Sequence, residues 1–171
     1  MFGMGKVVVI MGVCGSGKTT VGKALASRTG GTFIEGDSFH PEANVEKMRS
    51  GQPLTDDDRQ GWLESLGEEI GEHASNEAAP CFVGCSALKA SYRDILREGA
   101  PNLQIVWLKG SRDVLAQRMN ERRGHFMPAG LLDSQLATLE APHRAIVVGV
   151  DQTPRTIVDS VLEQLNLGDF L

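Results

Sequence analysis

One short stretch, residues 12–19 (GVCGSGKT), has the residue types needed to hold a nucleoside triphosphate. It fits the pattern G-x-x-x-x-G-K-S/T, in which glycines let the backbone turn so that its N–H groups face phosphate oxygens. In that pattern Lys18 reaches the β- and γ-phosphates, and the Thr19 hydroxyl ligates Mg²⁺. The sequence therefore predicts a nucleotide and Mg²⁺ site. The residues assigned to the nucleotide are Gly12, Val13, Cys14, Gly15, Ser16, Gly17, Lys18, Thr19 and Thr20.

A second candidate group follows the β-rich run at residues 32–36. Asp37 would lie at the carboxyl end of a parallel strand, where side chains face the ligand crevice. A carboxylate there can orient or deprotonate an alcohol that attacks the γ-phosphate. The alternative for Asp37 is an Asx turn or a helix N-cap, and we favour the catalytic role. His40 fits either a cap of the same turn or a bond to a substrate oxygen.

A third group follows the run at residues 81–85. Small residues, including Ser86, would let a ligand approach the backbone closely. Lys89 and Arg93 lie four residues apart and so share a helical face. They fit an anion-binding pair and a solvated basic face equally well.

Basic residues also crowd the segment AQRMNERRGHFMP. Arg118 and Arg122 share a helical face, and Arg123 follows them. Such a cationic helix end could neutralise the transferring phosphoryl group, with Gly124 and Pro128 bracketing the hinge of a lid. The alternative is a basic helix C-terminus that only complements the macrodipole.

Three adjacent aspartates, Asp56, Asp57 and Asp58, resemble a metal site at first sight. Consecutive helical residues point about 100° apart, so three in a row converge poorly on one ion. Thr55 is a suitable N-cap, and Asp58 stands three residues later, where the acid of a capping box belongs. We therefore predict a helix start that directs Arg59 into an acceptor cleft. A secondary role for one aspartate, such as Asp57, in holding the lid or a water molecule stays open.

The elements that must position these residues alternate along the chain. Apolar, β-rich runs are followed by helical patterns, and this order predicts a single α/β domain, residues 1–171, with a parallel sheet. Strands are expected at 6–11, 32–36, 81–85, 103–108 and 145–150. Helices are expected at 18–28, from 41 onward, 55–73, 88–98, 111–123, 131–140 and 154–166.

Composition narrows the class of protein. The 171 residues carry a formal net charge of −5, which argues against a surface that binds nucleic acid. Three cysteines without CxxC spacing argue against a disulfide framework or a zinc site and favour a reducing cytoplasm. No apolar run approaches the length of a membrane span. A guanine-reading N-K-x-D motif is also missing, so a small-molecule kinase is the leading class.

Several motifs together resemble the gluconate kinases of the thermoresistant type. They are GVCGSGKT, GDSFHPEANVEKMRSGQPLTDDDRQGWL, CSALKASYRDILREG, VWLKG and RMNERRGHFMP, spread over residues 7–152. The resemblance implies a three-layer α/β/α P-loop fold of the nucleoside monophosphate kinase type, with five parallel strands and a mobile lid. It also implies ATP-dependent phosphorylation of D-gluconate and a homodimer.

Gluconate has a carboxylate at one end and a primary hydroxyl at the other, so its site needs an anion anchor and an acidic group. Within the resemblance, the acceptor segment is about 37–75 and the lid about 118–135. Arg59 and Arg93 are the expected carboxylate anchors. The substrate-binding candidates are Asp37, His40, Arg49, Arg59, Ser86, Lys89, Arg93 and Gln135; the catalytic candidates are Lys18, Asp37 and Arg122; and Arg118 and Arg122 are expected at the nucleotide.

Two alternatives stay open at this level. One is a kinase of the same fold with another acceptor, such as shikimate or a nucleoside monophosphate. The other is an ATP-binding module without catalysis, against which Lys18, Thr19 and Asp37 argue together.

Overall fold

The protein is built on one five-stranded, all-parallel sheet with the strand order β2-β3-β1-β4-β5. The computed structural model describes residues 6–75, 79–121 and 129–167. The strands are β1 (Val7–Met11), β2 (Thr32–Glu35), β3 (Cys81–Gly84), β4 (Gln104–Lys109) and β5 (Ile146–Gly149). All five predicted strands are confirmed to within two residues at either end.

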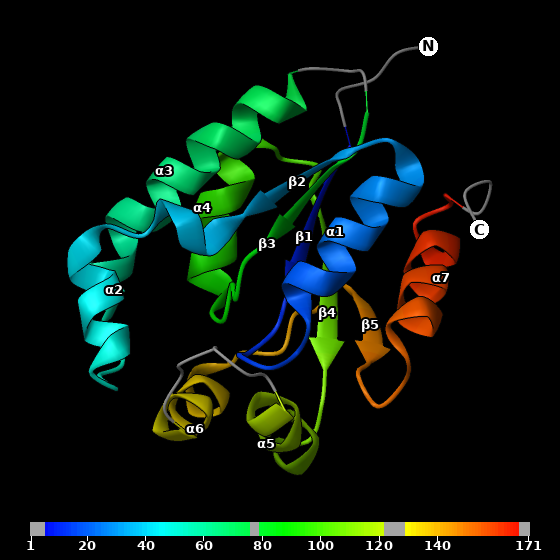
Figure 1. Cartoon of the computed structure of the whole chain (residues 1–171). Helices are drawn as coiled ribbons and strands as arrows, with labels where there is room; N and C mark the ends of the chain where they lie inside the picture. Colours follow the sequence, from blue (N-terminus) through cyan, green and yellow to red (C-terminus); the bar gives the residue numbers. More distant parts are fainter. Residues whose placement is uncertain (1–5, 76–78, 122–128, 168–171) are drawn as a thin grey trace.

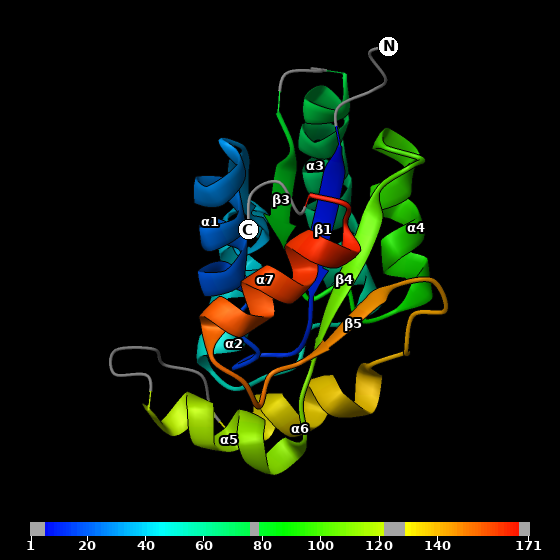
Figure 2. The same cartoon turned by 90° about the vertical axis from the view of Figure 1, so that its right-hand side faces the viewer.

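Helices cover both faces of this sheet, which is why its central strands are apolar throughout. Every residue of β1 and β3 is buried. The helices α1 (Lys18–Thr29) and α7 (Pro154–Gln164) pack together on one face, and α3 (Asp56–Ala74) and α4 (Ala90–Gly99) pack on the other (Figure 1, Figure 2). The predicted three-layer α/β/α architecture is confirmed.

The contact between α3 and α4 is unusually close because glycine permits it. A Cβ on Gly99 would lie 2.4 Å from the carbonyl oxygen of Gly67. No side chain larger than hydrogen therefore fits at Gly99 without moving one of the helices. This close contact joins the carboxy-terminal half of α3 to the last turn of α4.

The remaining elements gather at the carboxyl ends of the strands. The short 3-10 helix η1 (Gly36–Phe39) follows β2 and leads into α2 (Glu42–Arg49). Helices α5 (Arg112–Glu121) and α6 (Ala129–Thr138) lie beyond the ends of β4 and β5, on the same side as the loop after β1 (Figure 2). In parallel α/β sheets this edge is where ligands bind. In the part of the chain that the structure describes, no helix has the length and apolar character to cross a bilayer.

Candidate active site

The loop between β1 and α1 has the geometry of a phosphate-binding loop. Gly17 has φ of +92°, a left-handed conformation that favours glycine, and it caps the start of α1. The loop and the first turn of α1 therefore present their N–H groups to the pocket edge. The Lys18 Nζ donates to the carbonyl oxygens of Gly12 (3.0 Å) and Val13 (3.1 Å), so the side chain folds back over the loop.

The carboxylate of Glu35 contacts the phosphate-binding loop at Thr19, the residue expected to hold the metal ion. Thr19 Oγ1 donates to Glu35 Oε2 at 2.5 Å, and Glu35 is the last residue of β2. A hydroxyl beside a carboxylate is a set of hard oxygen ligands that suits Mg²⁺. Glu35 was not among the predicted site residues. The signal that could have found Glu35 is an acidic residue at the end of a predicted strand, two residues before Asp37.

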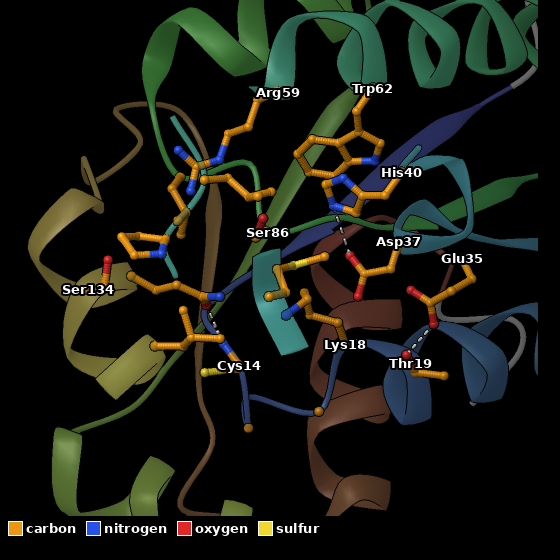
Figure 3. Close-up of a pocket in the computed structure, with 18 residues that line it drawn as sticks. Cys14, Lys18, Thr19, Glu35, Asp37, His40, Arg59, Trp62, Ser86 and Ser134 are labelled. Atoms are coloured by element: carbon orange, nitrogen blue, oxygen red, sulfur yellow. Dashed lines mark hydrogen bonds and ion pairs between the residues drawn. The ribbon is translucent and has the colours of Figure 1, made fainter. Parts of the chain in front are cut away.

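Asp37 and His40 face each other across the turn formed by η1 (Figure 3). The Asp37 carboxylate is 62% exposed, whereas the His40 side chain is only 3% exposed. His40 Nε2 lies 3.9 Å from Asp37 Oδ1, and the imidazole stacks on the indole of Trp62 with centroids 3.9 Å apart. Trp62 Nε1 in turn donates to the carbonyl oxygen of Gly36 at 2.8 Å. The stack thus ties the turn to α3.

Arg59 reaches the pocket from the first turns of α3 and is held there by α4. Its Nη1 donates to Tyr92 Oη at 2.8 Å, and the Tyr92 hydroxyl donates to Asp56. Lys89 also bonds Asp56, at 3.0 Å. Hydrogen bonds from Tyr92 and then Lys89 lower the pKa of Asp56, so this acid stays ionised. Asp56 and Tyr92 together fix the guanidinium of Arg59.

The aspartates of the triplet make different contacts, and they do not converge on one point. Thr55 Oγ1 accepts from the Asp58 N–H and Asp58 Oδ2 accepts from the Thr55 N–H, so the predicted capping box is confirmed. Asp58 also accepts from Lys47 Nζ at 2.7 Å, and that bond, followed by the Thr55 N–H, lowers the pKa of Asp58 to about 2. Asp56 points to α4. Across the described residues, no three acidic, histidine or cysteine side chains are grouped to hold a metal ion.

Of the three predicted site residues after β3, the structure places only one on the pocket. Ser86 lines the pocket. Arg93 is buried and donates to the Ala87 carbonyl oxygen at 2.7 Å, so it supports the loop that carries Ser86. Lys89 is engaged with Asp56, and the structure does not place it or Arg93 on the pocket.

Three further predicted residues are placed differently from one another. Arg49 is 70% exposed and pairs with Glu46 at 3.6 Å, away from the pocket. Gln135 on α6 lines the pocket, and its Oε1 accepts from the Cys14 N–H of the phosphate loop at 2.8 Å. Arg118 bonds the carbonyl oxygens of Val150 and, at 3.2 Å, Gln152, on the loop before α7. The predicted lid residues Arg122, Arg123, Gly124 and Pro128 lie outside the described residues.

One pocket brings the two halves of the predicted site together (Figure 3). Its phosphate side has Lys18 and Thr19, and its other side has Asp37 and Arg59. The rest of the lining includes apolar side chains that were not among the predicted site residues. The full lining is Cys14, Gly15, Gly17, Lys18, Thr19, Glu35, Asp37, His40, Met48, Pro53, Leu54, Arg59, Trp62, Ser86, Leu88, Leu131, Ser134 and Gln135.

Comparison of the sequence with known proteins identifies its relatives. Residues 7–142 match a family model described as an AAA domain. The chain is 41% identical to the thermoresistant gluconokinase of Escherichia coli (strain K12) over 167 residues, which cover 95% of this chain and 94% of that one.

Solved structures give the same result. A gluconokinase from Sinorhizobium meliloti 1021 superposes with a TM-score of 0.86 at 50% identity, covering 96% of this chain and 93% of that one. An unliganded sugar kinase from Janibacter sp. HTCC2649 gives a TM-score of 0.89 at 45% identity, covering 97% and 98%. The chain therefore belongs to the gluconokinase family, as the motifs predicted.

Proposed function

We propose that this protein transfers the γ-phosphoryl group of ATP to the primary hydroxyl of D-gluconate, giving 6-phospho-D-gluconate and ADP. The observation that carries the proposal is the shared pocket. A carboxylate (Asp37) and a guanidinium (Arg59) that suit a hydroxy acid line the same cavity as Lys18 of the phosphate loop. Family membership supports gluconate over other hydroxy acids.

Asp37 is the group we assign to the attacking hydroxyl. In the transfer, the primary hydroxyl oxygen forms a bond to the γ-phosphorus, and the bond to the β–γ bridging oxygen breaks, with its electrons leaving on ADP. The hydroxyl proton goes to the Asp37 carboxylate, which is exposed to the pocket and free to accept it. Lys18 and the loop N–H groups stabilise the charge on the transferred group.

Thr19 and Glu35 would hold Mg²⁺. When bound, the ion neutralises charge on the β- and γ-phosphates and orients them. The 2.5 Å contact between Thr19 Oγ1 and Glu35 Oε2 brings the two oxygens side by side, which supports assigning both residues to the ion. Glu35 therefore joins Thr19 among the residues we assign to the metal.

Arg59 is the residue we assign to the gluconate carboxylate. Guanidinium groups bind carboxylates in a bidentate manner, and Tyr92 orients this one. His40, Ser86 and Gln135 line the pocket and are available to the hydroxyls between the two ends. Arg93, Lys89 and Arg49 are engaged elsewhere, and we assign them supporting or surface roles.

Arg118 and Arg122 remain assigned to the nucleotide. Arg118 stands 4.0 Å from the place that a Cβ on Gly17 would occupy, next to the phosphate loop. Arg122 is proposed to neutralise the transferring group from a lid. A cytoplasmic location is part of the proposal, because three cysteines without CxxC spacing suit a reducing compartment.

A coupled assay for ADP release tests the proposal against its alternatives. The protein is offered ATP and Mg²⁺ with gluconate, shikimate or AMP in separate reactions. Release that depends on gluconate supports the proposal. A response only to shikimate or AMP would assign another acceptor, and no response to any of them would favour a binding module.

A further inference from the structure

The side chain of Asn44, on α2, is almost fully buried and yet polar. It is 3% exposed, and it lies behind His40 as seen from the pocket. Its Nδ2 donates to the carbonyl oxygen of Asp58 at 2.8 Å. A carbonyl oxygen can only accept, so this bond fixes which end of the amide carries the hydrogens.

The same nitrogen also contacts His40. Asn44 Nδ2 lies 3.1 Å from His40 Nδ1. An amide NH₂ has two hydrogens and does not accept, so the second hydrogen must point to Nδ1. His40 Nδ1 is therefore the acceptor, and a neutral ring that accepts at Nδ1 carries its hydrogen at Nε2.

The donor nitrogen of His40 is directed to the acceptor end of the pocket. Nε2 stands 3.9 Å from Asp37 Oδ1, which is too long for a direct hydrogen bond. One oxygen atom placed between the two would be within reach of both. That oxygen must accept from Nε2 and donate to Oδ1, and a hydroxyl can do both, whereas a carboxylate or a carbonyl cannot.

We infer that Asn44 is a positioning residue that fixes His40 as an Nε2–H donor, so that His40 and Asp37 together select a hydroxyl group of the acceptor. The identity of that acceptor rests on the proposed function, whereas the tautomer of His40 does not. Burial supports the neutral ring, because it lowers the pKa of His40 to about 4 against the raising effect of Asp37, and Arg59 lowers that pKa further.

The surroundings explain why the ring cannot turn over to exchange its nitrogens. The imidazole is stacked on Trp62 with an interplanar angle of 22°. The carbonyl oxygen that anchors Asn44 belongs to Asp58, which is itself held by the capping box and by Lys47. The first turn of α3 thereby determines, through Asn44, which ring nitrogen of His40 carries the hydrogen.

The tautomer can be measured directly by ¹⁵N NMR of protein labelled at histidine, without nucleotide or acceptor. The sequence has four histidines, and His40→Gln identifies the His40 signals by their loss. We expect Nε2 to be protonated and Nδ1 unprotonated at pH 7.5. An Nδ1–H tautomer, a mixture of both tautomers, or a charged ring at this pH would overturn the inference.

The variant Asn44→Asp keeps the shape of the side chain but replaces the donor by an acceptor. We expect it to protonate Nδ1 and to raise the KM for gluconate about tenfold, with less than about a twofold change in the KM for ATP. Asn102→Asp makes the same charge change at an exposed loop position and should alter neither. An unchanged tautomer in Asn44→Asp, or equal effects on both KM values, would contradict the positioning role.

Folding and function can be separated in these experiments. If Asn44→Asp unfolds, Asn44→Ser serves as the second variant, because its hydroxyl can still donate to one of the two acceptors and so gives a smaller loss of tautomer preference. If the wild-type protein shows the Nε2–H tautomer but does not phosphorylate gluconate, the proposed function fails and the positioning of His40 stands. If gluconate is phosphorylated and the tautomer is wrong, only this inference fails.

Discussion

The two ends of the pocket are built by different means. At the phosphate end, one continuous loop and the start of α1 supply backbone N–H groups, with Lys18 added. At the acceptor end, side chains from η1, α3 and α4 meet, and each is held by another side chain or carbonyl. The phosphate end is thus determined by local chain geometry, and the acceptor end by packing between segments far apart in sequence.

This difference predicts how each end responds to substitution. Changes at the acceptor end should act on gluconate and leave ATP nearly unaffected. Changes to the residues behind it should act in the same direction but more weakly, because they move a group rather than remove it.

The largest effect is expected for Asp37→Asn. The amide cannot take the hydroxyl proton, so kcat should fall by about 10²- to 10⁴-fold while ATP binding stays nearly unchanged. Steady-state kinetics and nucleotide titration measure the two quantities. Asp57→Asn, an exposed change on α3 outside the pocket lining, is the matched control and should keep wild-type turnover. Near-normal turnover in Asp37→Asn would remove Asp37 from the role.

The next effect is expected for Arg59→Ala. Loss of a charged hydrogen-bonding partner should raise the KM for gluconate about tenfold or more, and the KM for ATP much less. Arg49→Ala removes an arginine that is paired with Glu46 outside the pocket and should change neither value. Equal effects of Arg59→Ala on both substrates would break the distinction between the two ends.

Tyr92→Phe tests the support behind Arg59. It removes the hydroxyl that accepts from Arg59 and donates to Asp56 but keeps the ring that Arg59 faces 5.2 Å away. We expect the KM for gluconate to rise by about two- to fivefold, because the change loosens the Arg59 guanidinium without removing it. A larger effect than that of Arg59→Ala would mean that Tyr92 contacts the substrate itself.

Two helix caps give a matched pair with a smaller effect. Thr55 caps α3, which carries Arg59, and Thr153 caps α7, on the opposite face of the sheet. Alanine at either position should cost about 1 kcal/mol of unfolding free energy, measured by denaturant titration. Only Thr55→Ala should also raise the KM for gluconate. If Thr153→Ala raises it as much, the start of α3 has no special role.

The smallest effect concerns pH. The folded-state pKa of His40 is lowered from 6.5 to about 4 by burial, so the unfolded chain binds the proton first as the pH falls. The stability that depends on neutral His40 is complete above pH 6.5 and is lost as the pH falls from there toward 4. Between pH 7.5 and 6.0, His40→Gln should therefore lose less stability than wild type in thermal melts. Parallel losses in both proteins would contradict the lowered pKa.

The sequence predicted the sheet, its strands and the phosphate loop because these depend on short patterns. Continuous apolar runs identified β1 and β3, and Thr55 with Asp58 identified the start of α3. Glu35 and Asn44 were missed, since an acid at a strand end and an amide in a helix are common. Only folding brings Glu35 to Thr19 and Asn44 to His40. Arg93 shows the converse, because helical spacing grouped it with Lys89 but packing buried it against Ala87.

The central proposal is that one pocket joins a phosphate donor to the primary hydroxyl of a hydroxy acid. Its most direct test is NMR of the product formed from ATP and ¹³C-labelled gluconate, with phosphorus coupling read at each carbon. We expect a phosphomonoester on the terminal carbon farthest from the carboxylate. A phosphoryl group on the carboxylate or on a secondary hydroxyl would contradict the placement of Arg59 and Asp37 at opposite ends of the substrate.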